Sequence, residues 1–180
     1  YLNNISISSE YIKSDLNIQE LIGRGEDENL EFKSTLRWNV KECKLDKKME
    51  EVILKTIASF SNSEGGKLLI GLNDDGEILG LDDDYNTLNK PDKDGFELHL
   101  RNLLNSNFNK EFSSTNVKVK FYEIEDKEIC EVDVKAYKNP LFLIQTSKSG
   151  QKEEMFYVRN GNSSIALTLS ESSLYVKDRF

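Results

Sequence analysis

The spacing of apolar residues predicts a helix followed by a strand near the middle of the chain. Asp46 is the expected N-cap of this helix, and the glycine pair at 65–66 is expected to end it. The apolar run over 67–72 then fits a strand that is covered on both faces. The residues that mark the helix recur every three or four positions on one face: Met49, Val52, Ile53, Ile57 and Phe60.

A tight turn and a second helix follow in the pattern. The residues Asn73-Asp74-Asp75-Gly76 tolerate positive φ, so they predict a hairpin turn into a second strand that ends near Leu81. Asp94 as N-cap with Glu97 at the third helical position predicts a helix that stops near Ser106. Near the start, residues 1–14 are expected to be an edge strand or a disordered lead, and residues 15–22 a short helix.

After Thr115 the apolar residues alternate with polar ones, which is typical of strands. Two segments around the turn Glu125-Asp126-Lys127 predict an antiparallel hairpin. Two further strands and a last helix, which Ser170 caps and which runs through Arg179, complete the pattern. The four strands are expected over 117–122, 129–134, 141–145 and 155–159. The simplest architecture is a single α+β domain with a mostly antiparallel sheet flanked by two main helices.

Composition favours a soluble, cytoplasmic globular domain. The 180 residues are 37% hydrophobic and 31% charged, and no apolar run approaches the roughly 20 residues that a membrane-spanning helix needs. Cys43 and Cys130 lie far apart and outside any Cys/His cluster, so neither a disulfide framework nor a zinc site is expected.

The formal net charge of -8 argues against a protein that binds nucleic acid over its whole surface. One segment is nevertheless locally basic, and it surrounds the aromatic Trp38, which could stack on a base. The alternative is a solvated loop in which Trp38 anchors the core. The basic residues of this segment are Lys33, Arg37, Lys41, Lys44, Lys47 and Lys48.

An acidic segment precedes the strand-like sequence Leu-Glu-Phe-Lys at 30–33. In a strand, Glu31 and Lys33 project from the same face, and a carboxylate beside an ammonium suits metal-assisted phosphodiester cleavage. An exposed Glu/Lys ladder is the alternative interpretation. His99, the single histidine, lies at the edge of an apolar helix face, which favours a structural role over that of a general base.

Five segments, in this order, resemble the AlbA-like domain of the Schlafen superfamily in its bacterial form, over roughly residues 20 to 170. The first two are Gly25-Glu-x-x-x-Leu-Glu-Phe-Lys-Ser-x-Leu36 and Ser59-Phe-Ser-Asn-Ser-Glu-Gly-Gly66. The third is Leu69-Ile-Gly-Leu-Asn-Asp-Asp-Gly76 with Ile78-x-Gly-Leu81. The last two are Asp94-Gly-Phe-Glu-Leu-His-Leu100 and Tyr157-Val-Arg-x-Gly161 with Ser163. Residues 1–19 would then be a lead, and residues 171–180 a helix or the start of a linker.

The resemblance implies nucleic-acid binding, with RNA favoured over DNA. In Schlafens with nuclease activity, it also implies a three-carboxylate site that uses Mg²⁺ or Mn²⁺. Glu26 and Glu31 match the first two acids, Lys33 would assist, and Asp74 is the expected third acid, with Asp75 as the alternative. The nuclease cores resemble two such units with a zinc site, whereas this chain has one unit, so a homodimer could supply the second lobe.

Three functions follow as hypotheses. The first is a nucleic-acid-binding module that contacts phosphates through Lys33, Arg37, Lys41, Lys67 and Arg159, with Trp38 available to stack on a base. The second is a metal-dependent endoribonuclease. The third is a nucleotide-binding regulatory or oligomerisation module, fused to an effector domain, with a nucleotide at 62–66. That segment lacks the lysine and the spacing of a P-loop.

Overall fold

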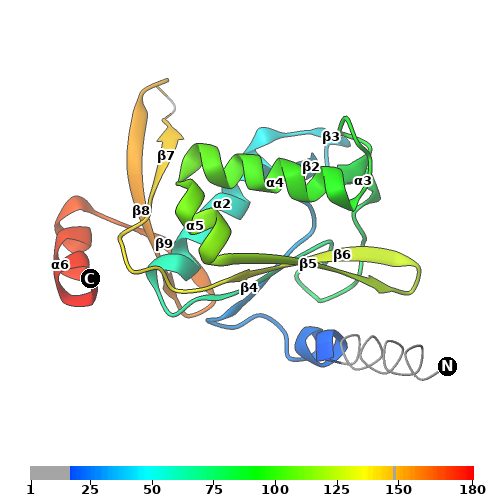
Figure 1. Ribbon diagram of the computed structural model, residues 1–180, viewed down its shortest axis with the longest axis horizontal. Coiled ribbons are helices and arrows are strands. Elements are labelled where there is room, and N and C mark those ends of the chain that lie inside the picture. Colours follow the sequence, from blue (N-terminus) through cyan, green and yellow to red (C-terminus); the bar gives the residue numbers. More distant parts are fainter. Residues whose placement is uncertain (1–16, 148) are drawn as a thin grey trace.

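A mixed four-stranded sheet lies at the centre of the computed structural model, which describes residues 17–147 and 149–180 (Figure 1). Its strand order is β1-β4-β6-β5, and β1 runs parallel to β4 while the other neighbours are antiparallel. The α+β prediction is confirmed, with one parallel pair added to a mostly antiparallel sheet. The strands are β1 (Leu30–Lys33), β4 (Gly66–Ile70), β5 (Val117–Ile124) and β6 (Lys127–Val134).

Two long helices, α2 (Lys47–Asn62) and α4 (Lys93–Asn107), cover one face of this sheet (Figure 1). The predicted cap of α2 is confirmed, because the Asp46 side chain accepts a hydrogen bond from the backbone N–H of Lys48. The helix ends at Asn62, before the glycine pair. Gly65 has a φ of +83°, and a Cβ there would lie 2.7 Å from the carbonyl oxygen of Val134, so only glycine fits this turn.

A second, three-stranded antiparallel sheet packs on the other side of α2. It consists of β7 (Phe142–Thr146), β8 (Lys152–Asn160) and β9 (Ser163–Leu167), of which β9 was not predicted. The last helix, α6, spans Leu169–Arg179. Its predicted cap was wrong by two residues: Thr168 rather than Ser170 caps the helix, in a capping box with Glu171.

Several short elements differ from the predictions. Two short helices were not predicted: α3 (Asp82–Tyr85) precedes α4, and α5 (Lys110–Thr115) follows it. The expected second strand after the turn is reduced to a single bridge between Leu72 and Ile78. Asp94 does not cap α4: Asp92 does, by accepting from the N–H of Gly95, while Asp94 pairs with Lys90.

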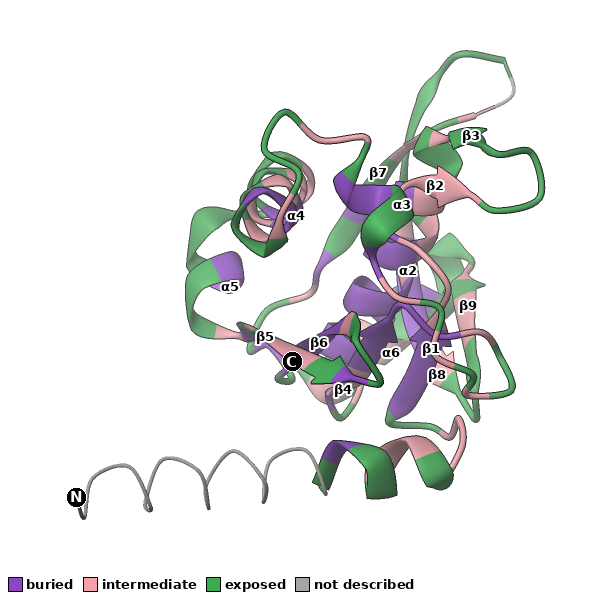
Figure 2. Ribbon diagram, turned by 90° about the vertical axis from the view of Figure 1, so that its right-hand side faces the viewer, coloured by how far each residue is buried: buried purple, intermediate pink, exposed green. Residues whose placement is uncertain are grey.

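Apolar side chains fill both faces of the four-stranded sheet. The larger cluster joins α2, α4 and both sheets, and includes Ile53, Phe60 and Phe96. The smaller cluster lies on the opposite face, under the helical segment over 17–23, where Ile18 packs against Leu30 and its neighbours (Figure 2). The lead predicted over 1–14 lies outside the described residues. None of the helices in the described part is both long and apolar enough to cross a bilayer.

Candidate nucleic-acid interface

Glu26 and Glu31, predicted as metal ligands, take part in separate contacts. β1 is an edge strand, and Oε1 of Glu26 accepts a hydrogen bond from the backbone N–H of Phe32 at 2.7 Å. Glu31 is 9% exposed and lies between two cations. Its Oε1 is 2.6 Å from Nζ of Lys33, and its Oε2 is 2.9 Å from Nη1 of Arg159. Glu26 therefore provides an acceptor for a backbone N–H of the edge strand β1, and Glu31 neutralises two basic side chains.

Arg159 lies inside the domain. Its side chain is 4% exposed, and its guanidinium lies over the ring of Phe60, 4.8 Å from the ring centre. Besides Glu31, it donates to the carbonyl oxygen of Asp27 at 2.9 Å and to that of Glu28 at 3.2 Å. Because these contacts engage all three of its nitrogens, Arg159 connects β8 to the segment before β1 and has little capacity left for a phosphate.

Asp74 lies on the exposed turn between β4 and the bridge at Ile78. Oδ1 of Asn73 organises this turn by accepting from the N–H groups of Asp75 and Glu77, at 3.1 and 2.8 Å. Within residues 17–147 and 149–180, no group of three or more His, Cys, Asp or Glu side chains gathers in a metal-binding arrangement. The residues present do not fit Mg²⁺ or Mn²⁺ in this arrangement, and metal-dependent cleavage stays a prediction.

The predicted basic residues separate into two sets. Lys33, Arg37 and Lys67 are partly buried and paired with acids. Nε of Arg37 is 3.2 Å from Oε1 of Glu50, and Nζ of Lys67 is 2.6 Å from Oε1 of Glu131. Four lysines, by contrast, are exposed: Lys41, Lys44, Lys47 and Lys48. Of these, Lys44 contacts an acid, Glu42, at 2.5 Å in an exposed pair.

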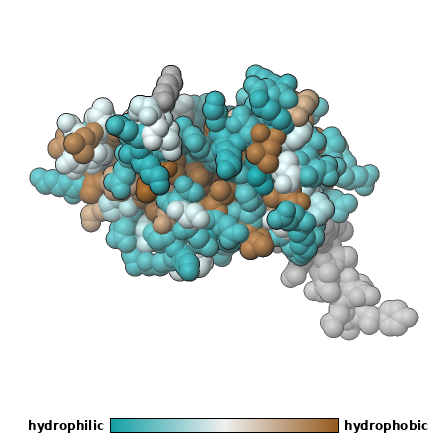
Figure 3. Space-filling view, turned by 90° about the horizontal axis from the view of Figure 1, so that it is seen from above, coloured by the Kyte–Doolittle hydropathy of each residue, from teal (hydrophilic) through white to brown (hydrophobic). Residues whose placement is uncertain are grey.

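We refer to residues 40–48, which carry the four exposed lysines, as the basic loop. It comprises the turn after β2 (Trp38–Asn39), the short strand β3 (Lys44–Leu45) and the first two residues of α2, and it projects from the molecule in Figure 2. Oδ1 of Asn39 accepts from the N–H groups of Lys41 and Glu42, both at 3.1 Å. The face seen from above, which carries α4 and these strands, is largely hydrophilic (Figure 3). The loop is thus an ordered, exposed, lysine-rich surface.

Asp84 positions the segment that leads into this loop, a role that was not predicted from the sequence. It is 1% exposed, and its carboxylate accepts from the backbone N–H groups of Leu36, Arg37 and Trp38 at 2.7 to 3.0 Å. Burial raises the pKa of Asp84, against the lowering effect of the three N–H donors. Trp38 is half-buried, so it is held in place while part of its side chain stays accessible. In the sequence, Asp84 is the last of three consecutive aspartates, and nothing local distinguishes it from Asp82 and Asp83.

His99 has the structural partner that its sequence context favoured. Its Nε2 lies 2.7 Å from Oε1 of Glu50, a residue of α2 that is 7% exposed. The contact joins α4 to α2.

Comparison with known proteins gives the family and supports the fold. The DIP2311 protein of Corynebacterium diphtheriae has a similar structure, with a TM-score of 0.51 and 17% identity. The match covers 84% of this chain but 24% of that protein, so this chain spans about a quarter of its length. The N-terminal domain of a RecG-related protein of Nitrosomonas europaea matches with a TM-score of 0.43 and 19% identity, over 79% of this chain and 84% of that one. The family model described as Schlafen, AlbA_2 matches residues 26–168, and the chain therefore belongs to the Schlafen AlbA_2 family.

Proposed function

We propose that this domain binds nucleic acid, with RNA as the preferred class, and that the basic loop makes the main contacts with the phosphate backbone. The observation that carries the proposal is the exposure of Lys41, Lys44, Lys47 and Lys48 within one short continuous segment, the basic loop. Other predicted basic residues, such as Lys33 and Arg159, are paired with Glu31 inside the domain. Membership of the Schlafen AlbA_2 family is consistent with this function.

Because the overall charge is -8, the position of the exposed lysines decides where on the surface nucleic acid can bind. A strand that approached an arbitrary part of this surface would meet a net excess of carboxylates, which repel phosphate. On the basic loop, four ammonium groups lie within eight residues, beside Trp38. Its accessible part could stack on an unpaired base, which favours single-stranded or looped RNA over a continuous duplex.

The test is fluorescence anisotropy with a labelled RNA hairpin and a DNA duplex over a series of salt concentrations. If all four lysines contact phosphates, the slope of log K against log salt should be about -3 to -4. A variant with Lys41, Lys44, Lys47 and Lys48 all changed to Gln should bind much more weakly and with a flatter slope. Absence of binding at low salt would contradict the proposal.

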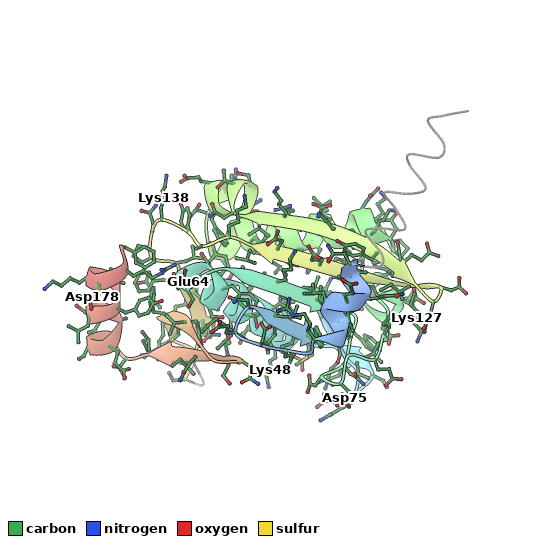
Figure 4. All side chains as sticks on the ribbon, turned by 90° about the horizontal axis from the view of Figure 1, so that it is seen from below. Lys48, Glu64, Asp75, Lys127, Lys138 and Asp178 are labelled. Carbon is green, nitrogen blue, oxygen red and sulfur yellow. The ribbon has the colours of Figure 1, made fainter. Side chains whose placement is uncertain are left out.

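A matched variant separates local contacts from overall charge. Changing Lys118, Lys120, Lys135 and Lys138 to Gln also removes four exposed lysines, at β5, after β6 and near α5. Figure 4 shows Lys138 on the opposite side of the molecule from Lys48. This control should bind nearly as well as the parent protein. Equal loss of binding in both variants would assign the effect to net charge and remove the basic loop from the proposal.

A further inference from the structure

A recess of about 390 Å³ lies beside the N-terminal half of α4, between that helix and the segment before β2. Its volume is within the range of about 300–1,000 Å³ that is typical of small-molecule sites. The recess is independent of the basic loop, which contributes none of its lining residues. The polar side chains that line it include Arg37, Asn89, Lys90, His99 and Asn102.

Glu50 holds two of these side chains from behind. Its Oε1 lies 3.2 Å from Nε of Arg37 and 2.7 Å from Nε2 of His99. The contact with Arg37 is ionic, without the alignment of a hydrogen bond. Because Glu50 is 7% exposed and belongs to the middle layer of the fold, it fixes both groups at the wall of the recess. This arrangement resembles the way in which a buried carboxylate orients a functional histidine.

The atoms that Glu50 leaves available suit an anion. In the described residues, Nη1 and Nη2 of Arg37 and Nδ1 of His99 have no hydrogen-bond partner. The two Nη groups of an arginine form a planar fork that matches two oxygens of a phosphate or carboxylate. Amide groups of Asn89 and Asn102 lie at the same wall and can donate to further oxygens.

The nearby carboxylates already have partners. Oδ2 of Asp94 lies 2.6 Å from Nζ of Lys90, and Oδ1 of Asp92 accepts from the N–H of Gly95. Lys90 also lies 3.4 Å from Oδ2 of Asp92. Lys90 thus offsets part of the charge of the two carboxylates at the rim, and Arg37 and His99 are the groups that face the interior of the recess.

We propose that Arg37 and His99 form a binding site for a phosphomonoester. A tetrahedral, doubly charged phosphate offers enough oxygens for the arginine fork, the imidazole and one of the amides together. The phosphomonoester can belong to a small metabolite such as a mononucleotide, or to the terminal phosphate of a nucleic acid. Both sources present the same group to these residues.

The single histidine gives a direct probe of the site. Because the sequence contains one histidine, the imidazole signals in an NMR spectrum of the untagged chain come from His99 alone. At constant neutral pH, inorganic phosphate and AMP should shift these signals saturably. Adenosine, and sodium chloride at matched ionic strength, should not. A response that does not saturate, or that chloride reproduces, would overturn the proposal.

Two variants test the site itself. Arg37→Gln removes the fork and should weaken AMP binding by about tenfold or more. Leu98→Trp should also weaken it, because Leu98 lines the recess and is 63% exposed, so a larger ring fills the space without burdening the core. Lys138→Gln, which removes a charge near α5, should bind as the parent does. If folded Leu98→Trp protein keeps the full response, the recess is not the binding site.

Oligonucleotides distinguish the sources of the phosphate. A short RNA with a 5′-phosphate that shifts the His99 signals more than its 5′-hydroxyl counterpart supports a terminal phosphate as the ligand. A response to AMP but to neither oligonucleotide supports a free small phosphomonoester. Equal responses to both oligonucleotides would show recognition of the diester backbone and would overturn the proposal. The variant that lacks the four lysines of the basic loop should keep its response to AMP, which separates this site from the proposed function.

Discussion

Glu31 balances two cations, Lys33 and Arg159, at a place from which water is largely excluded. Removing one member of such a cluster leaves the others without a counter-charge in a poorly solvated position. We expect Glu31→Gln to lower the free energy of unfolding by about 3 kcal/mol, measured by urea denaturation. Glu26→Gln is the matched control, because a glutamine keeps an oxygen acceptor for the N–H of Phe32. A Glu31→Gln protein as stable as the parent would show that the cluster does not stabilise the fold.

The same pair of variants tests the predicted cleavage of RNA. If Glu26 and Glu31 ligate Mg²⁺ or Mn²⁺, both substitutions should abolish metal-dependent cleavage under conditions in which both proteins remain folded. If Glu26 serves only the N–H of Phe32 and Glu31 only Lys33 and Arg159, any cleavage by the parent protein should survive in both folded variants. A gel assay of total RNA with and without Mn²⁺ gives the answer, provided that circular dichroism confirms folding.

Asp84 is a second residue whose carboxylate organises backbone. An asparagine at this position would direct an amide NH₂ or a single oxygen at three N–H donors, so at least one donor would lose its partner. Asp84→Asn should therefore destabilise the protein by about 2 kcal/mol. Its neighbours on α3, Asp82 and Asp83, are exposed, and their carboxylates accept no backbone hydrogen bonds from the described residues, so Asp83→Asn should be close to neutral. Equal denaturation midpoints for the two variants would contradict this role.

At the scale of elements, Asn62 joins α2 to the three-stranded sheet. Its side chain donates to the carbonyl oxygens of Leu141 and Tyr157 and accepts from the N–H of Leu141, all at 2.8 to 2.9 Å. Asn62→Ala should cost about 3 kcal/mol, because it leaves buried backbone groups without partners. The adjacent hydroxyl of Ser61 is buried and has no hydrogen-bond partner among the described residues, so Ser61→Ala should be neutral or slightly stabilising. The reverse order of stability would refute this assignment.

The capping box of α6 should make the stability of this helix depend on pH. Hydrogen bonds from the backbone N–H and the hydroxyl of Thr168 lower the pKa of Glu171. Since its pKa is lower in the folded than in the unfolded state, the cap stabilises fully above the unfolded pKa and weakens as the pH falls through the folded pKa. Amide exchange in α6 should accelerate over that acidic range in the parent protein. In Glu171→Gln the acceleration of amide exchange should be smaller. If the pH dependence of exchange is the same in both proteins, Glu171 is not its cause.

The sequence predicted long periodic elements well, and short or distant ones poorly. α2, β5 and β6 were located because many residues share one period, which local side-chain spacing encodes. α3, α5 and β9 were missed because so few residues carry little periodicity, and packing decides their structure. The contact between Glu31 and Arg159 spans 128 positions and depends on β8 lying beside β1. Both residues were identified by type, but their mutual neutralisation could not be read from local spacing.

For the whole molecule, the placement of α2 between the two sheets makes us expect cooperative unfolding. The buried face of α2 belongs to the same apolar cluster as Val132 of β6 and Leu143 of β7. If either sheet separates from α2, apolar residues of the shared cluster become exposed to water. We therefore expect both sheets and α2 to unfold in a single transition. Far-UV circular dichroism and the fluorescence of Trp38, the single tryptophan, should give coincident urea curves.

Native-state hydrogen exchange resolves the two sheets separately. If they unfold together, the slowest amides of β6 and β8 should report the same opening free energy, equal to that of global unfolding. Asn62→Ala, which weakens the link between α2 and the three-stranded sheet, should lower both values equally. A fall confined to β8 would show that the three-stranded sheet opens as an independent unit. In that case Arg159, which β8 carries, would leave Glu31 during the opening and expose an acidic side chain that the closed domain keeps neutralised.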